Sequence, residues 1–165
     1  RSWSIDGTRY GESLELSQQD TLVLLVNERY KIPENLYIDH NVFQLASSNM
    51  IAPDIRIYSA EGSTPTLRVQ FYTQEEKPVY DNMDFNWNYK NDTLRFDNYI
   101  KLAGQWRAQR VTLTLYLPEN KKVLLPPQTS QYLRNLRDFD RGVRSRLNKD
   151  KILLIMQDGK LQPLM

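Results

Sequence analysis

The sequence predicts an all-β domain, and three observations support that class. Apolar and polar residues alternate with period two in several short segments, as at residues 111–117, and alternate side chains of a strand point to opposite faces. Turn-forming residues separate these segments at intervals of about 8 to 15 residues. Helical spacing of apolar residues occurs only at 130–140. We therefore expect a solenoid-like roll of about ten short strands, with at most one short helix near 130–140, and a two-sheet β-sandwich as the alternative.

The expected strands differ in how many of their faces are apolar. After a first short strand around Leu14, residues 67–72 and 83–89 alternate as half-buried strands do. The segments TLVLLV (21–26) and ILLIM (152–156) are apolar at successive positions. This composition is typical of central strands that are covered on both faces.

Residues 106–122, WRAQRVTLTLYLPENKK, permit two interpretations. An aromatic residue and two arginines before an alternating run are typical of a binding platform, whereas the alternation itself is typical of one strand with a core face. The second interpretation predicts four buried aliphatic side chains: Val111, Leu113, Leu115 and Leu117. Pro118 then ends the strand because it lacks an N–H for the ladder, and Asn120 tolerates the left-handed conformation of the reversal. Trp106 and Arg107 are expected to cap the start of the strand.

The helix expected near residues 130–140 depends on side-chain spacing alone. Its apolar residues recur at intervals of three and four: Tyr132, Leu133, Leu136 and Phe139. Ser130 is the expected N-cap residue.

Two short texts occur twice in the chain. QQDTLVLL, which begins at residue 18, is similar to KNDTLRFD, which begins at residue 90. IPENLYIDH, which begins at residue 32, is similar to LPENKKVLL, which begins at residue 117. The two separations differ, so the chain is not a strict repeat. The echoes indicate that one strand-turn-strand unit is used twice, which suits either a roll or a sandwich.

Length and charge predict one domain with a basic C-terminal part. A chain of 165 residues can bury a core without disulfides, and we expect residues 1–165 to form a single domain, with the basic segment 134–165 packing on it or trailing from it. Residues 1–100 carry 9 basic and 15 acidic side chains, whereas residues 101–165 carry 13 and 5. Such asymmetry favours an acidic partner, although an ordinary solvated basic face explains it as well.

The basic segment supplies the weak surface-contact candidates of the sequence. They are five arginines: Arg134, Arg137, Arg141, Arg144 and Arg146. Nucleic acid, an anionic lipid surface, a protein or water alone are the possible neighbours. Asp138, Asp140 and Asp150 interrupt the basic stripe, which argues against binding along a phosphate backbone. We therefore predict no nucleic-acid partner.

Catalytic signatures are weak. The sequence has no cysteine and a single histidine, His40, which removes thiolate nucleophiles and the common multi-histidine metal sites. It also lacks a glycine-rich phosphate loop and a nucleophile elbow. A glycosidase needs two facing carboxylates, and four carboxylates lie near Trp87 in the sequence: Glu75, Glu76, Asp81 and Asp84. A charged loop before a strand is the simpler interpretation, so we predict a non-enzymatic protein without metal or cofactor.

Aromatic residues support an alternative function. The chain has eighteen, of which ten are tyrosine, and a β surface of this composition can furnish a stacking platform for sugars. Tyrosine also suits half-buried strand positions, so abundance alone does not discriminate. A carbohydrate-binding or adhesin module is therefore the alternative to a protein-interaction module.

Residues 92–125, DTLRFDNYIKLAGQWRAQRVTLTLYLPENKKVLL, resemble the envelope-domain segment of bacterial membrane proteins that begin with a phage-shock-protein-C-type (PspC) membrane segment. The shared pattern is Leu-x-x-Asp-x-Tyr, then Trp-Arg-x-Gln-x-Val, then Tyr-(Val/Leu)-Pro-Glu-Gly-Lys. Its positions here are Leu94, Asp97, Tyr99, Trp106, Arg107, Gln109, Val111, Tyr116, Leu117, Pro118, Glu119 and Lys121. Asn120 replaces the usual glycine, and LLPPQT replaces an acidic continuation. A looser similarity extends upstream and to the final MQDGKLQPLM.

The resemblance implies a non-catalytic, β-rich head on the periplasmic side of the inner membrane, related to adhesin-head domains of Gram-negative envelopes. It also implies a membrane-anchored parent protein with a role in envelope stress or regulation, and a protein or another envelope component as partner. The sequence holds no run of about 20 apolar residues, so we expect the anchor to lie outside it. The resemblance supplies no catalytic or binding residues.

Overall fold

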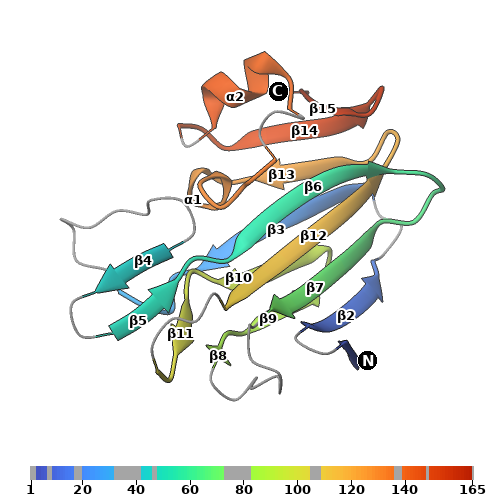
Figure 1. Cartoon of the computed structure of the whole chain (residues 1–165). Coiled ribbons are helices and arrows are strands. Elements are labelled where there is room, and N and C mark those ends of the chain that lie inside the picture. Colours follow the sequence, from blue (N-terminus) through green and yellow to red (C-terminus); the bar gives the residue numbers. More distant parts are fainter. Residues whose placement is uncertain are drawn as a thin grey trace.

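The computed structural model describes nine stretches of the chain: residues 3–6, 9–16, 20–31, 42–45, 48–72, 83–104, 109–135, 139–147 and 149–164. They contain fifteen strands and two short helices (Figure 1). The strands form three sheets, which confirms the predicted all-β class. The excess over about ten predicted strands comes from very short ones, such as β8 (Met83–Asp84).

Sheet A has five strands, one of which is the alternating segment at residues 111–117. In spatial order the strands are β1 (Trp3–Asp6), β2 (Arg9–Glu15), β7 (Thr66–Tyr72), β12 (Arg110–Pro118) and β6 (Asp54–Ala60). β12 pairs antiparallel with β7 and parallel with β6. At most 1% of each predicted core residue of β12 is exposed: Val111, Leu113, Leu115 and Leu117. The strand interpretation of this segment is therefore confirmed.

Sheet B has six strands. In spatial order they are β15 (Lys160–Pro163), β14 (Ile152–Gln157), β13 (Lys122–Leu125), β3 (Thr21–Asn27), β10 (Thr93–Asp97) and β9 (Trp87–Lys90). β3 lies parallel to both β10 and β13. The two copies of the Asp-Thr-Leu motif therefore stand at the starts of neighbouring parallel strands, β3 and β10. The repeated sequence thus corresponds to two adjacent strands of one sheet. The basic C-terminal segment supplies β14 and β15, whose inward side chains belong to the shared core.

Sheet C is a small extension at one end. It contains β4 (Val42–Leu45), β5 (Ser48–Ile51), β11 (Ile100–Leu102) and β8. All its pairs are antiparallel. Ile51, Met83, Ile100 and Leu102 are buried and join the core cluster, so this sheet is packed against the rest of the molecule.

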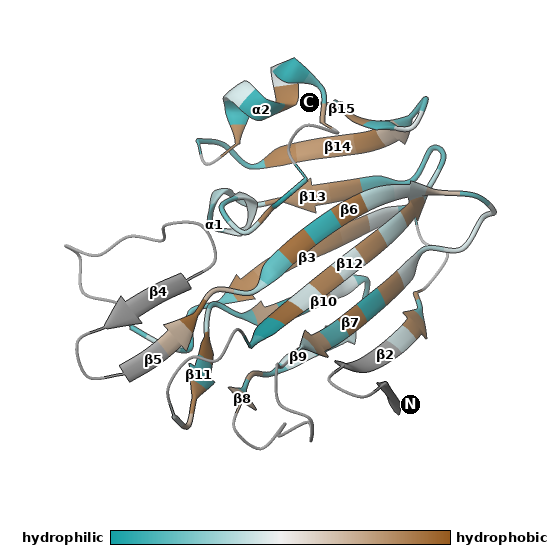
Figure 2. Ribbon diagram, viewed as in Figure 1, coloured by the Kyte–Doolittle hydropathy of each residue, from teal (hydrophilic) through white to brown (hydrophobic). Residues whose placement is uncertain are grey.

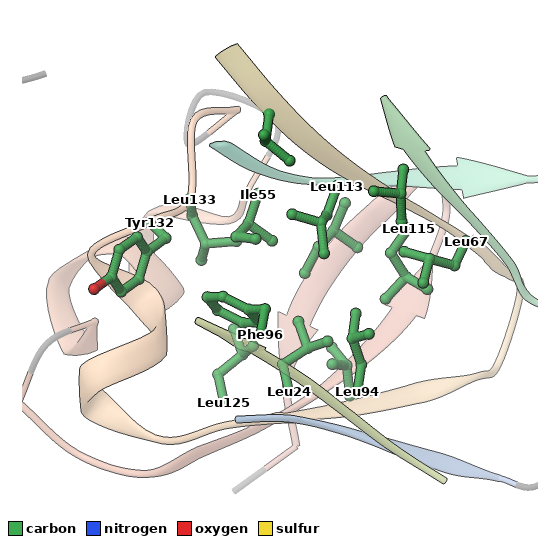
Figure 3. Packing of buried hydrophobic residues seen from close by; sticks show 14 of the residues in the cluster. Leu24, Ile55, Leu67, Leu94, Phe96, Leu113, Leu115, Leu125, Tyr132 and Leu133 are labelled. Atoms are coloured by element: carbon green, nitrogen blue, oxygen red, sulfur yellow. The ribbon is translucent and has the colours of Figure 1, made fainter. Parts of the chain in front are cut away.

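Sheets A and B face each other across one hydrophobic core. Figure 3 shows Ile55, Leu67, Leu113 and Leu115 of sheet A on one side of the core, with Leu24, Leu94, Phe96 and Leu125 of sheet B on the other. The two-sheet alternative therefore describes the core. The predicted roll describes the path of the chain, which passes from one sheet to the other. For example, β12 of sheet A is followed by β13 of sheet B through a reversal at Asn120, whose φ is 70°. Asparagine tolerates this left-handed conformation, as the sequence predicts.

The predicted helix needs a correction in position. The two helices, α1 (Pro127–Ser130) and α2 (Arg141–Arg146), lie on either side of the expected segment, and residues 131–135 are not helical. Tyr132 and Leu133 are buried as the spacing requires, but their backbone pairs with the edge of β6. The N–H of Ile55 donates to the carbonyl of Tyr132 at 2.9 Å, and the N–H of Arg134 donates to the carbonyl of Ile55 at 2.9 Å. Pairing with β6 thus replaces the helical hydrogen bonds.

Asn135 completes this closure of the sheet edge. Its side-chain amide accepts from the N–H of Ile57 at 3.1 Å and donates to the carbonyl of the same residue. Trp106 and Arg107, the expected caps of β12, lie outside the described residues, as do His40 and Leu136.

Candidate functional site

The outer face of sheet A carries the polar half of the alternation. Six side chains on three neighbouring strands point away from the core, and we call them the tyrosine–arginine face: Arg56, Tyr58, Arg68, Tyr72, Arg110 and Tyr116. Arg68 and Arg110 are exposed, and the other four are half-buried. Tyrosine and arginine are among the residues that contribute most to binding energy at protein interfaces.

Cross-strand register brings these side chains into contact. Tyr116 lies opposite Tyr58, with ring centroids 6.3 Å apart and ring planes tilted by 33°. Arg110 lies opposite Tyr72, with its guanidinium carbon 4.6 Å from the ring centroid. Arg56 Nη1 lies 3.5 Å from the Tyr58 hydroxyl oxygen. Because each contact restricts rotamers before any partner binds, less side-chain entropy is lost on association.

Smaller polar groups fill the centre of the face. Thr112, Thr114 and Gln70 point outward, yet only 6% of each is exposed. The Tyr72 hydroxyl donates to Gln70 Oε1 at 2.9 Å. The centre of the face is therefore filled by packed polar side chains.

A buried carboxylate balances part of the positive charge. Asp54, at the start of β6, is wholly buried. Arg134 Nε lies 3.2 Å from its Oδ1, and Arg56 Nη2 lies 4.0 Å from its Oδ2. Burial raises the pKa of Asp54, and the positive charges of Arg134 and Arg56 oppose that rise. With Arg68 and Arg110 also on the outer side, arginines outnumber this carboxylate, so the face is electropositive.

A groove of about 570 Å³ adjoins the face at Tyr58. It runs between β6 and the hairpin of β14 and β15, and its lining includes Ser59, Gly159 and Lys160. The backbone N–H and carbonyl groups of Ile55 and Ile57 that point away from β12, along the edge of the sheet, form hydrogen bonds with residues 132–135. Because the backbone groups of successive residues in a strand point to alternate sides, Ser59 also directs its N–H and carbonyl toward this edge of β6, at the mouth of the groove.

The five arginines predicted from the sequence are divided between different surroundings. Arg134 binds Asp54 beneath the edge of the tyrosine–arginine face. Arg141 and Arg144 are exposed on α2, and Arg146 is half-buried at its end. Arg137 lies outside the described residues. Arg134 is thus linked through Asp54 to Arg56 of the face.

A second charged cluster joins β3, β8 and β10. The Arg29 guanidinium contacts Asp97 at 2.8 Å and holds both carboxylate oxygens of Asp84, at 2.9 and 2.8 Å. The Tyr30 hydroxyl donates to Asp84 at 3.1 Å, and the N–H of Asn86 donates to Asp97 at 2.7 Å. These bonds connect three strands of sheets B and C at their ends.

The protonation states of this cluster suit an ion pair. The hydrogen bond from Arg29 lowers the pKa of Asp84, and the bonds to Asp97 and Asp84 raise the pKa of Arg29. Burial, followed by the bond to Asp84, raises the pKa of Tyr30 to about 12. A glycosidase acid requires a raised carboxyl pKa, which is the opposite of what Asp84 experiences. Glu75, Glu76 and Asp81 lie outside the described residues.

Sequence reasoning missed the arginines that form the face. Arg68 was visible as the polar member of an alternating pair with Leu67, and Arg110 as the residue before an alternating run. The uneven distribution of charge along the chain indicated residues 134–146 instead. What brings Arg56, Arg68 and Arg110 together is the lateral order of β6, β12 and β7, which local pattern does not encode.

Two kinds of feature are absent from the described residues. No cluster of three or more histidine, cysteine, aspartate or glutamate side chains with metal-binding geometry occurs among them. No helix in the same residues has the length and hydropathy that crossing a membrane demands.

Fold and surface together define an all-β domain, with two facing sheets and a preorganised polar face. The chain matches, over residues 33–163, the family model described as the toast-rack domain found at the C-terminus of some PspC proteins. It therefore belongs to this family of toast-rack domains, and the resemblance to PspC proteins is confirmed. The family indicates that the chain is part of a membrane protein. No curated protein and no solved structure matches the chain.

Proposed function

We propose that this chain is a non-enzymatic interaction domain of a membrane-anchored bacterial envelope protein. It stands on the periplasmic side of the inner membrane and takes part in envelope stress sensing or regulation. The tyrosine–arginine face supports this proposal, because it combines two of the three residue types most enriched in interface hot spots with contacts that restrict their rotamers.

The proposed partner is an envelope protein with an acidic surface. Arg68 and Arg110 are exposed on a face where, among the described residues, arginines outnumber the carboxylates Asp54 and Glu15. Complementary charge across an interface speeds association and selects the partner. The groove beside Tyr58 extends the same contact, because an extended segment of the partner can pair with the outward backbone groups of Ser59.

Charge reversal on this face tests the proposal. In the membrane-anchored parent protein, a photo-crosslinking side chain in place of Tyr116 is expected to capture one partner protein. The double variant R68E/R110E should lower the crosslinked yield at least about tenfold, because two favourable charge contacts become repulsive. The yield is measured by blotting, and thermal unfolding of the isolated variant checks that it folds.

The matched control is R141E/R144E, which changes the formal charge equally on exposed residues of α2. It should leave the yield unchanged. If R141E/R144E abolishes the crosslink and R68E/R110E does not, the arginines predicted from sequence are the contact surface, and the tyrosine–arginine face is not.

A carbohydrate-binding or adhesin function is the second candidate. The half-buried, tilted pair of Tyr58 and Tyr116 supports it, since such rings can stack on a sugar. Trp87 is packed against the core. Binding of glycans on an array that is lost in a Tyr58→Ala variant would favour this candidate over the protein partner.

A further inference from the structure

The outer face of sheet B is apolar but is not fully covered, although the sequence predicted that both faces of its central strands would be covered. The segments 21–26 and 152–156 were expected to be covered on both faces, but their outward side chains are only half-buried. With neighbours on β13 and after β15 they form what we call the apolar stripe: Val23, Leu25, Leu124, Leu153, Ile155 and Leu164. Figure 2 shows β13 and β14 hydrophobic along most of their length, whereas β7 and β12 alternate.

The stripe is continuous across four strands. Leu124 lies directly opposite both Val23 and Leu153, and the N–H of Leu164 donates to the carbonyl of Leu153 at 2.8 Å. With strands about 4.8 Å apart, this row extends across roughly 14 Å. Leu164 is the most accessible member, with 47% of its surface exposed. A patch of this kind is typical of a contact surface.

Basic side chains border the stripe on the same face. Arg95 lies opposite Leu25, and Lys122 lies opposite Ile155. Lys90 and Lys160 occupy further outward positions at the two sides of the sheet. Two carboxylates near this face are paired with cations, Asp97 with Arg29 and Asp20 with Lys122. The face therefore combines partly exposed aliphatic side chains with a basic border.

We propose that this outer face of sheet B docks on an anionic lipid bilayer. Aliphatic side chains that enter the interfacial region, bordered by cations near anionic headgroups, are what peripheral membrane binding requires. Each lysine or arginine close to such a surface contributes about 1 kcal/mol. A second copy of the chain fits less well, since stacking two such faces would bring their basic borders together. This surface is distinct from the tyrosine–arginine face, so either proposal can fail alone.

Vesicle binding tests the proposal directly. The isolated chain should co-sediment with vesicles of phosphatidylcholine mixed with phosphatidylglycerol, should bind far less to phosphatidylcholine alone, and should be released by salt. The variant K90E/R95E should weaken the apparent affinity at least about tenfold, because two attractive charges become repulsive. Leu164→Glu should also weaken it, since the change places a carboxylate on the most exposed part of the stripe.

The control is R68E/R110E, which alters formal charge equally on sheet A and should bind as the unmodified chain does. Co-sedimentation that is equal on both vesicle types, or unchanged in K90E/R95E, would overturn the proposal. So would a chain that stays off the vesicles but sediments as a dimer which Leu164→Glu converts to monomer, because the face would then be an interface between copies.

Discussion

Replacing Phe96 with alanine is expected to destabilise the domain by about 3 to 5 kcal/mol, the range of large aromatic truncations in a core. Phe96 is wholly buried between the two sheets, and its ring meets that of Tyr132 edge-to-face, with centroids 5.6 Å apart. The truncation removes packing against sheet A and against Tyr132 at the same time. Urea unfolding followed by circular dichroism measures the change.

The neighbouring Arg95 supplies the control for this prediction. Its side chain points outward on the same strand and is exposed, so Arg95→Ala should change the free energy of unfolding by less than about 0.5 kcal/mol. A loss below about 1 kcal/mol for Phe96→Ala would mean that the two sheets do not share the core described above.

Removing the Asp97 carboxylate is expected to have the second largest effect. Asp97→Ala leaves the N–H of Asn86 without its acceptor and deprives Arg29 of a buried partner. Breaking a buried ion pair from one side costs about 3 to 5 kcal/mol. Because 34% of the Arg29 side chain is exposed and water can compensate it in part, we expect about 2 to 4 kcal/mol here.

Asp84 provides a matched comparison on the same guanidinium. Its side chain is 52% exposed, so Asp84→Ala should cost less than about 1 kcal/mol, as exposed ion pairs do. Equal losses for the two variants in urea unfolding would show that charge alone matters. We expect unequal losses, because Asp97 is buried and also accepts the hydrogen bond from Asn86.

The sequence was most informative where local pattern decides the structure. The alternation at residues 111–117 predicted which side chains of β12 enter the core, because period two and a single buried face leave one choice of register. Pro118 and Asn120 likewise predicted the end of that strand and its left-handed turn. The family followed from the same segment, since its motif spans the strand and the turn.

The remaining features depend on contacts between distant segments. The spacing of Tyr132 and Leu133 suggested a helix, but hydrogen bonds between this segment and Ile55 of β6 take the place of a continued helix. The basic stripe was visible in the sequence, whereas the pairing of Arg134 with the buried Asp54 was not, because 80 residues separate them. Parallel pairing of β6 with β12, which assembles the tyrosine–arginine face, has no local signature.

Single-cysteine labelling in cells tests the central claim, that this domain stands outside the inner membrane with its tyrosine–arginine face against a partner. The chain contains no cysteine, so Glu61→Cys and Arg68→Cys can each report on one exposed position. In cells whose inner membrane is intact, a membrane-impermeant maleimide should label Glu61→Cys rapidly. It should label Arg68→Cys much more slowly than in the isolated chain. Labelling of Glu61→Cys only after the inner membrane is opened, or equal rates for Arg68→Cys in cells and in isolation, would contradict the account.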